Sequence, residues 1–152
     1  MPVRKQNKTY PTEKARLEKK GVPGGKNRRA RRARRKAATK ALKQLQGSTV
    51  KNTATGRQVR IVKDSVKETA HHAQGDTLST LAAMDARRQI RDAKPVRTAK
   101  AKNNRRQTDM KLNEVTVMKG KLLTADTKVI VGKRGKYEHV LYSITAKPRK
   151  KK

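Results

Sequence analysis

The 152-residue sequence contains no cysteine, tryptophan or phenylalanine, and it has only three tyrosines. The absence of cysteine excludes disulfides, a thiolate nucleophile and cysteine-based zinc sites. Three tyrosines are too few for a platform of stacking aromatics of the kind that some RNA-binding sheets use. Hydrophobic residues make up 32% of the chain, against roughly 45–50% in globular domains. The sequence therefore predicts at most one small hydrophobic core.

Long apolar runs are also missing. No window approaches the roughly 18–20 apolar residues of a membrane span, and no apolar run follows the basic N-terminus Met1–Lys5. We therefore expect no membrane partner and no secretion, but a location in the cytoplasm or inside a virion. Acidic residues are scarce as well: 11 of them oppose 43 lysines and arginines, which gives a net charge of +32. Such a charge predicts a polyanionic partner, above all nucleic acid.

Recognisable catalytic patterns are absent. The glycine-rich segments at 21–26 and 132–136 lack the pattern of a phosphate-binding loop, which requires Ser or Thr after the lysine. The adjacent His71 and His72 have no third metal ligand at a suitable spacing. The acids are scattered, and Asp85 and Asp92 lie next to arginines, so we interpret them as local charge neutralisation rather than a two-metal nuclease cluster. We expect no enzyme activity, no cofactor and no metal.

Positive charge is concentrated at the two ends of the chain. Residues 1–50 carry 17 basic and 2 acidic side chains, residues 51–100 carry 11 and 5, and residues 101–152 carry 15 and 4. We divide the chain into a basic N-terminal extension (1–56), a strand plus helix (57–93), a basic connector (94–111) and a hairpin-rich segment with a basic C-terminal tail (112–152). Blocks of like charge are typical of segments that are disordered or become ordered on a partner.

Local patterns predict the elements of a small α+β fold. Expected helices cover 12–20, 28–46 and 78–93, because each lies between a capping residue and a glycine or proline break. Expected strands cover 57–62, 115–118, 128–131 and 137–144, the last two joined as a hairpin by Gly132–Gly135. Residues 48–56, 69–76 and 94–106 are expected to be linkers. The core should come from about 57–93 and 112–146, as a few short antiparallel strands and one or two helices with long basic extensions.

The arginine-rich helix is the most distinctive feature of the sequence. Its arginines and alanines alternate so that cations lie on nearly every side of a helix that starts after Asn27 and ends before Gly47. Arginine suits phosphate because its planar guanidinium can donate two parallel hydrogen bonds. The predicted nucleic-acid-binding residues here are Arg28, Arg29, Arg31, Arg32, Arg34, Arg35, Lys36 and Lys40.

The expected hairpin turn supplies a second basic cluster. Lys133, Arg134 and Lys136 surround the glycines of this turn. A turn between two strands projects from a sheet, so these cations are expected to reach phosphate groups. The alternative is a turn that only faces solvent.

The stretch Arg29-Ala30-Arg31-Arg32-Ala33 resembles the arginine-rich RNA-binding motif of phage N-type antitermination proteins. This resemblance implies a regulatory protein that grips one short RNA hairpin through residues 27–46. The combination of basic extensions and a small globular part also resembles ribosomal proteins and viral coat or core proteins.

Our leading hypothesis is a non-enzymatic structural protein that contacts the phosphate backbone within a ribonucleoprotein or virion assembly. Its expected partners are nucleic acid, with RNA slightly favoured over DNA, and other proteins of that assembly. The antitermination-type regulator is the alternative, and a nucleic-acid enzyme is the third possibility.

Overall fold

The computed structural model describes residues 23–102, 105–122 and 125–148, and these form an α+β fold, as the sequence predicts. The helix expected at 12–20 lies outside the described residues. The helices are α2 (Arg28–Lys43), α3 (Lys63–Ala73), α4 (Thr77–Met84), α5 (Ala86–Asp92) and α6 (Arg105–Asp109). The strands are β1 (Thr49–Lys51), β2 (Gln58–Arg60), β3 (Lys94–Lys100), β4 (Glu114–Lys121), β5 (Ala125–Arg134) and β6 (Glu138–Pro148).

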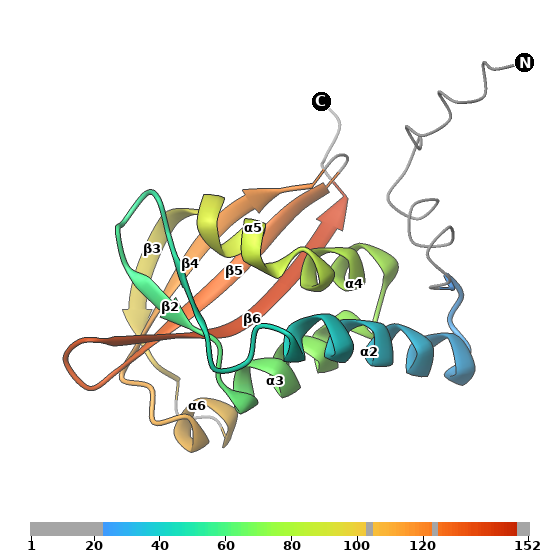
Figure 1. Ribbon diagram of the computed structural model, residues 1–152, viewed down its shortest axis with the longest axis horizontal. Helices are drawn as coiled ribbons and strands as arrows, with labels where there is room; N and C mark the ends of the chain where they lie inside the picture. Colours follow the sequence, from blue (N-terminus) through green and yellow to red (C-terminus); the bar gives the residue numbers. More distant parts are fainter. Residues whose placement is uncertain (1–22, 103–104, 123–124, 149–152) are drawn as a thin grey trace, which may run out of the picture.

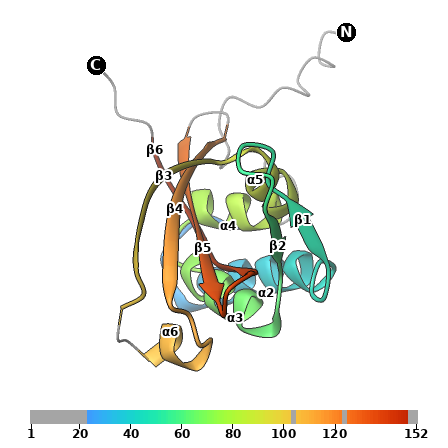
Figure 2. The ribbon, with the colours of Figure 1, turned by 90° about the vertical axis from the view of Figure 1, so that its left-hand side faces the viewer.

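All six strands belong to one sheet with the order β1-β2-β6-β5-β4-β3. The β2–β6 pair is parallel and the other pairs are antiparallel, so the sheet is mixed. The predicted hairpin is confirmed: β5 and β6 pair along their length and turn at Gly135, whose φ of 67° suits glycine. Figure 1 shows α2, α3 and α4 together on one side of the sheet, and Figure 2 views the sheet from the end that carries this hairpin.

Helix α2 is part of the folded core. It begins where the sequence predicts, because the Asn27 side chain accepts a hydrogen bond of 2.8 Å from the Ala30 N–H. It ends at Lys43, three residues before the predicted end. Ala38 and Leu42 are fully buried in the main hydrophobic cluster. The prediction of a core that starts near residue 57 is therefore wrong.

Helix α3 replaces a predicted loop. The sequence predicts a loop over 69–76, but α3 extends to Ala73. Val66, Thr69, Ala70 and Ala73 are buried and follow helical spacing, so one narrow stripe packs against the rest of the protein. Polar residues surround this stripe, and they mask its period in the sequence.

The helix predicted at 78–93 is divided in two. Asp76 caps α4 by accepting a 2.7 Å hydrogen bond from the Ser79 N–H. The helical path is interrupted at Asp85, where φ is −107° and ψ is 25°, and α5 starts at the next residue. The break changes the direction of the second half, so Ile90 also reaches the core.

Segments expected to be linkers supply both edges of the sheet. Residues 94–100 form β3, which pairs with β4 from Lys94↔Lys119 to Lys100↔Glu114. Every residue of β3 is exposed, which explains why its sequence carries no alternating apolar pattern. Its lysines, its proline and a register shift are features that protect exposed sheet edges. The other edge, β1, lies within the predicted 48–56 linker.

The opposite face of the sheet carries a second, smaller cluster. It comprises Met110, Leu112, Val115, Val140 and Tyr142, beside α6. Gly132 permits this packing, because a Cβ there would lie 2.5 Å from a Leu112 methyl carbon. Within the described residues, no helix has the length and apolar character needed to cross a membrane.

Candidate nucleic-acid interface

Helix α2 presents most of its circumference to solvent. Its buried residues, Ala30, Arg34, Ala38 and Leu42, are spaced four apart and face α3 and α4. The remaining cations point outward. We define the α2 surface as Lys26 together with the exposed cations Arg28, Arg29, Arg31, Arg32, Arg35, Lys36 and Lys40.

Arg34 is the arginine of α2 that does not point outward, and the sequence gives no sign of this difference. Its side chain is 1% exposed, and its guanidinium donates to four backbone carbonyls: those of Gln74 at 3.0 Å, Pro23 at 3.1 Å, Gly24 at 3.3 Å and Gly25 at 2.8 Å. Burial lowers the pKa of this guanidinium. The prediction that Arg34 binds nucleic acid is therefore corrected. Its guanidinium holds the 23–25 segment and the end of α3 against α2.

A hollow of about 330 Å³ opens beside this buried arginine. Its lining consists of Lys26, Arg28, Arg31, Arg32, Arg35 and Gln74. No acidic residue is among these described lining residues. Five cations around one concave surface form a region of positive potential that suits an oxyanion, in particular phosphate.

Lys26 and Gln74 are the members of this site that sequence reasoning missed. Lys26 lies just before the helix cap, so its position next to the arginines was a usable signal. Gln74 follows α3 and is adjacent to α2 only because the two helices pack together. No pattern along the chain indicates that contact.

The hairpin cations lie on different sides of their turn. Arg134 is bound to Glu138 by hydrogen bonds of 2.7 and 3.1 Å, and Arg60 approaches the same carboxylate at 3.6 Å. The hydrogen bonds from Arg134 lower the pKa of Glu138. Lys136 is exposed, next to Tyr137, which is 88% exposed. Lys133 is half-buried and pairs with His139 across the hairpin.

The two predicted basic clusters do not form one site. In Figure 1 the arginine-rich end of α2 and the β5–β6 turn lie at opposite ends of the long axis of the domain. Helix α2 packs on α3 and α4, whereas the hairpin continues the sheet. A single ligand that contacts both clusters must therefore extend along the molecule.

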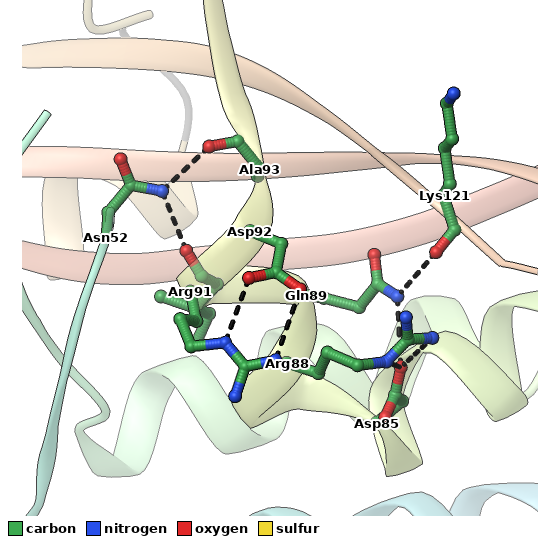
Figure 3. A network of polar contacts seen from close by, with 9 residues as sticks. Asn52, Asp85, Arg88, Gln89, Arg91, Asp92, Ala93 and Lys121 are labelled. Atoms are coloured by element: carbon green, nitrogen blue, oxygen red, sulfur yellow. Dashed lines mark hydrogen bonds and ion pairs between the residues drawn. The ribbon is translucent and has the colours of Figure 1, made fainter. Parts of the chain in front are cut away.

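Local charge neutralisation by the scattered acids is confirmed on α5. Arg88 binds Asp85 at 2.7 Å, and Arg91 binds Asp92 through hydrogen bonds of 2.9 and 3.2 Å (Figure 3). The bonds from Arg91 lower the pKa of Asp92. Figure 3 also shows that the Asn52 amide donates to the carbonyl of Ala93, which fixes the β1–β2 turn against the end of α5.

The adjacent histidines lie on α3. Both are exposed, and the His72 ring is 2.9 Å from the Glu68 carboxylate, one helical turn earlier. Over the ranges that the structure describes, no three His, Asp or Glu side chains gather as a metal site requires. The geometry thus offers two ligands on one helix and no third.

Comparison with protein families shows which family the chain matches. The model of large polyvalent protein-associated domain 3 matches residues 29–139. This range includes most of α2 and the β5–β6 turn. No curated protein and no solved structure matches the chain.

Proposed function

The chain belongs to the large polyvalent protein-associated domain 3 family, and on that premise we propose that it binds the phosphate backbone of nucleic acid through the α2 surface. The family match indicates a phage-related protein. Within this class, we propose a role in an assembly that contains nucleic acid and other proteins, in a virion or in the host cytoplasm. RNA is slightly favoured over DNA, because guanidinium groups both bind phosphates and stack on the exposed bases of folded RNA.

One observation carries the proposal: the α2 surface gathers seven cations of a folded helix together with Lys26 just before it, and five of these eight surround one hollow whose lining contains no acidic residue. Elsewhere on the domain, acids do accompany arginines, as at Asp85, Asp92 and Glu138. Acids of the protein accompany those arginines, whereas none lines the α2 hollow. This contrast supports a separate anionic partner for the α2 surface.

The position of these cations within α2 supports the same conclusion. The first turn of α2 contains no acidic residue, and its arginines lie at the N-terminal half. Cations are unfavourable there because the helix dipole already places partial positive charge at this end. Like charges three and four residues apart add to this cost. The negative charge of a bound phosphate backbone offsets both the unfavourable interaction with the helix dipole and the repulsion between the arginines.

The antitermination-type alternative requires an RNA groove to surround the helix. In this protein, α2 is attached to the domain along its whole buried stripe, from Ala30 to Leu42. Only its outward side is accessible to RNA. This arrangement favours contact along a backbone over complete embedding of the helix.

Salt-dependent binding tests the proposal. If the eight cations of the α2 surface neutralise about eight phosphates, log K should fall with log salt at a slope of about −7 on duplex DNA. A variant with Arg28, Arg31, Arg32 and Arg35 replaced by glutamine should flatten the slope by about 3 to 4. The matched control replaces Arg87, Lys94, Lys111 and Lys121, four exposed cations elsewhere, and should keep most of the slope.

A second variant separates charge from guanidinium geometry. Lysine replaces the five exposed arginines of α2, at 28, 29, 31, 32 and 35, which preserves net charge and helix propensity. A role in structured RNA predicts a loss of several kcal/mol and of discrimination against random duplex, because lysine lacks the planar fork. Unchanged affinity would favour general charge neutralisation, and a slope near zero in the unmodified protein would overturn backbone binding itself.

A further inference from the structure

A row of polar side chains crosses the sheet next to the β5–β6 turn. His139 of β6 pairs with Lys133 of β5, and Lys133 pairs with Glu114 of β4. Residues paired across neighbouring strands project from the same face of a sheet. The three side chains therefore lie side by side, with the lysine between the histidine and the glutamate. Lys133 and His139 face each other across the β5–β6 hairpin, and the β4–β5 register brings Glu114, 19 residues before Lys133, beside them.

The row lies on the face of the sheet that also packs against the helices. His139 pairs with Val59 of β2, and Val59 is buried in the main core. Thr116, two residues after Glu114, projects to the same side and accepts a 3.3 Å hydrogen bond from the Arg57 guanidinium. Arg57 thus reaches across this face of the sheet. We define the strand-end cluster as Arg57, Glu114, Thr116, Lys133 and His139.

The cluster faces an open end of the fold. Figure 2 views the sheet from this end, with β1 and β2 on one flank and β3 and β4 on the other. Arg57, Glu114, Lys133 and His139 are each half-buried rather than enclosed. Exposed Lys136 and Tyr137 lie at the adjoining turn. A chain-like ligand can therefore reach the cluster from solvent.

The electrostatics differ from those of a structural ion-pair network. Glu114 has lysine partners on both neighbouring strands, Lys133 and Lys100. Within the described residues, neither ammonium lies within 4.0 Å of its carboxylate. Burial lowers the pKa of His139, and the nearby charges of Arg57 and Lys133 lower it further, while Glu114 opposes them. A negatively charged ligand bound beside the His139 imidazole would therefore favour protonation of this ring.

We propose that the strand-end cluster cleaves RNA by metal-free transesterification, with Arg57 and Lys133 binding the phosphodiester and Glu114 and His139 transferring the protons. The Glu114 carboxylate accepts the proton of the ribose 2′-hydroxyl, and the 2′-oxygen forms a bond to phosphorus. The bond between phosphorus and the 5′-oxygen breaks, and protonated His139 donates its proton to that oxygen. The products are a 2′,3′-cyclic phosphate and a 5′-hydroxyl, and no metal, oxidant or water enters this step.

The order of the row fits this chemistry. In an in-line displacement, the attacking and leaving oxygens lie on opposite sides of the phosphorus, so the base and the acid must flank the phosphate-binding group. Lys133 lies between Glu114 and His139, whose strands are two spacings, or about 10 Å, apart. The Glu114 and His139 side chains can therefore approach the attacking 2′-oxygen and the leaving 5′-oxygen of a phosphodiester that Lys133 and Arg57 bind between them. The phosphate also offsets the positive charges of Arg57 and Lys133, which together with burial lower the pKa of His139.

This activity is separate from the binding proposed for the α2 surface, because the two sites share no residue. It differs from the expectation of a non-enzymatic protein, and the experiment below decides between the two. Metal-dependent nucleases and enzymes with a nucleophile motif leave patterns along the sequence, and this sequence has none of those patterns. The strand-end cluster comes from three strands and the β1–β2 turn region, and has no such pattern.

The experiment incubates the full chain with a synthetic single-stranded RNA in excess chelator, and analyses the ends of the products. Cleavage that leaves 2′,3′-cyclic phosphate and 5′-hydroxyl ends is the expected result. A copy of the RNA with one 2′-deoxy position should remain intact at that position and be cleaved elsewhere. DNA of the same sequence should be bound but not cleaved. The rate should rise toward mildly acidic pH, where His139 gains its proton beside Arg57, Lys133 and Glu114.

Variants connect the activity to the cluster. His139→Gln and Glu114→Gln should each lower the cleavage rate about 100-fold or more. Their thermal unfolding and their affinity for DNA should stay close to those of the unmodified protein. Lys51→Gln, which removes an exposed charge from β1, is the matched control and should cleave normally.

Three outcomes would overturn the activity. The first is RNA that stays intact from mildly acidic to neutral pH, and the second is cleavage only when a metal is added. The third is cleavage by the His139 and Glu114 variants at the same rate as by the unmodified protein, which would indicate a contaminating nuclease. If the α2 glutamine variant no longer binds nucleic acid but still yields the same cleavage products, only the proposal for the α2 surface is affected. The two proposals therefore fail independently.

Discussion

Arg34 and Arg35 are adjacent in sequence, but the structure assigns them opposite roles. Arg34 is buried and donates to four carbonyls, whereas Arg35 is exposed and lines the α2 hollow. Replacing each by alanine in separate variants should therefore affect different properties. Arg34→Ala should lower stability with little change in the salt slope of binding. Arg35→Ala should weaken nucleic-acid binding with little change in stability.

The magnitude for Arg34 follows from its contacts. Three of its hydrogen bonds are 3.1 Å or shorter and one is 3.3 Å. A net value of about 0.5–1 kcal/mol per bond applies here, since water can reach some of the freed carbonyls. Packing of the buried stem adds about 1 kcal/mol. With the packing included, the alanine variant should lose about 3–5 kcal/mol, which lowers Tm by roughly 10–15 °C for a domain of this size.

Chemical denaturation and calorimetry of both variants provide the measurement. Arg34→Met keeps most of the stem without the donors, so its loss should fall between those of wild type and Arg34→Ala. Arg35→Ala should stay within about 0.5 kcal/mol of wild type, as is usual for exposed positions. Equal stabilities for Arg34→Ala and Arg35→Ala would refute the reasoning, since they would show that the buried guanidinium does not hold the 23–25 segment.

Three further predictions concern the fold. Leu42→Ala should cost about 2–5 kcal/mol in denaturant unfolding, because Leu42 is fully buried; a negligible cost would show that α2 is a detachable extension. Gly120→Ala should cost about 1–3 kcal/mol by the same assay, because its Cβ would lie 2.6 Å from the Thr127 hydroxyl and 2.8 Å from the Gln89 side-chain oxygen, which are hydrogen-bonded to each other. The pKa of Glu138 is lowered in the folded state, so its ion pair stabilises the protein above the ordinary carboxyl pKa and ceases to do so as pH falls through the lowered value. Thermal melts of Glu138→Gln in that acidic range should show a weaker pH dependence than wild type, and identical profiles would contradict the ion pair.

Features encoded by neighbouring residues could be predicted from the sequence. The start of α2 follows from the Asn27 cap, and the β5–β6 hairpin follows from alternating apolar residues around a glycine-bounded turn. Local ion pairs on α5 follow from acids placed within one turn of arginines. In each case, the physical cause acts over a few residues, so the chain shows it directly.

Weak or masked periodicity explains the elements that were missed. Strand β3 is exposed at every position, so no buried face imposes an alternating pattern on it. Helix α3 buries only a narrow stripe of small and β-branched residues, which resembles a loop composition. The break between α4 and α5 falls at Asp85, and no proline or glycine marks it in the sequence.

The net charge of the protein and the concentration of arginine in one helix follow from the amino-acid sequence alone, because they depend only on composition and local spacing. They also favour an anionic ligand. Which arginine of the repeated Arg/Ala run is buried depends on tertiary packing, since the packing of α3 against α2 buries Arg34 and leaves the neighbouring arginines exposed. The register of β4 against β5 likewise places Glu114 on the same face as Lys133 and His139. Side chains separated by many residues can meet only through long-range pairing, and that pairing is set by how the whole chain buries its few apolar groups.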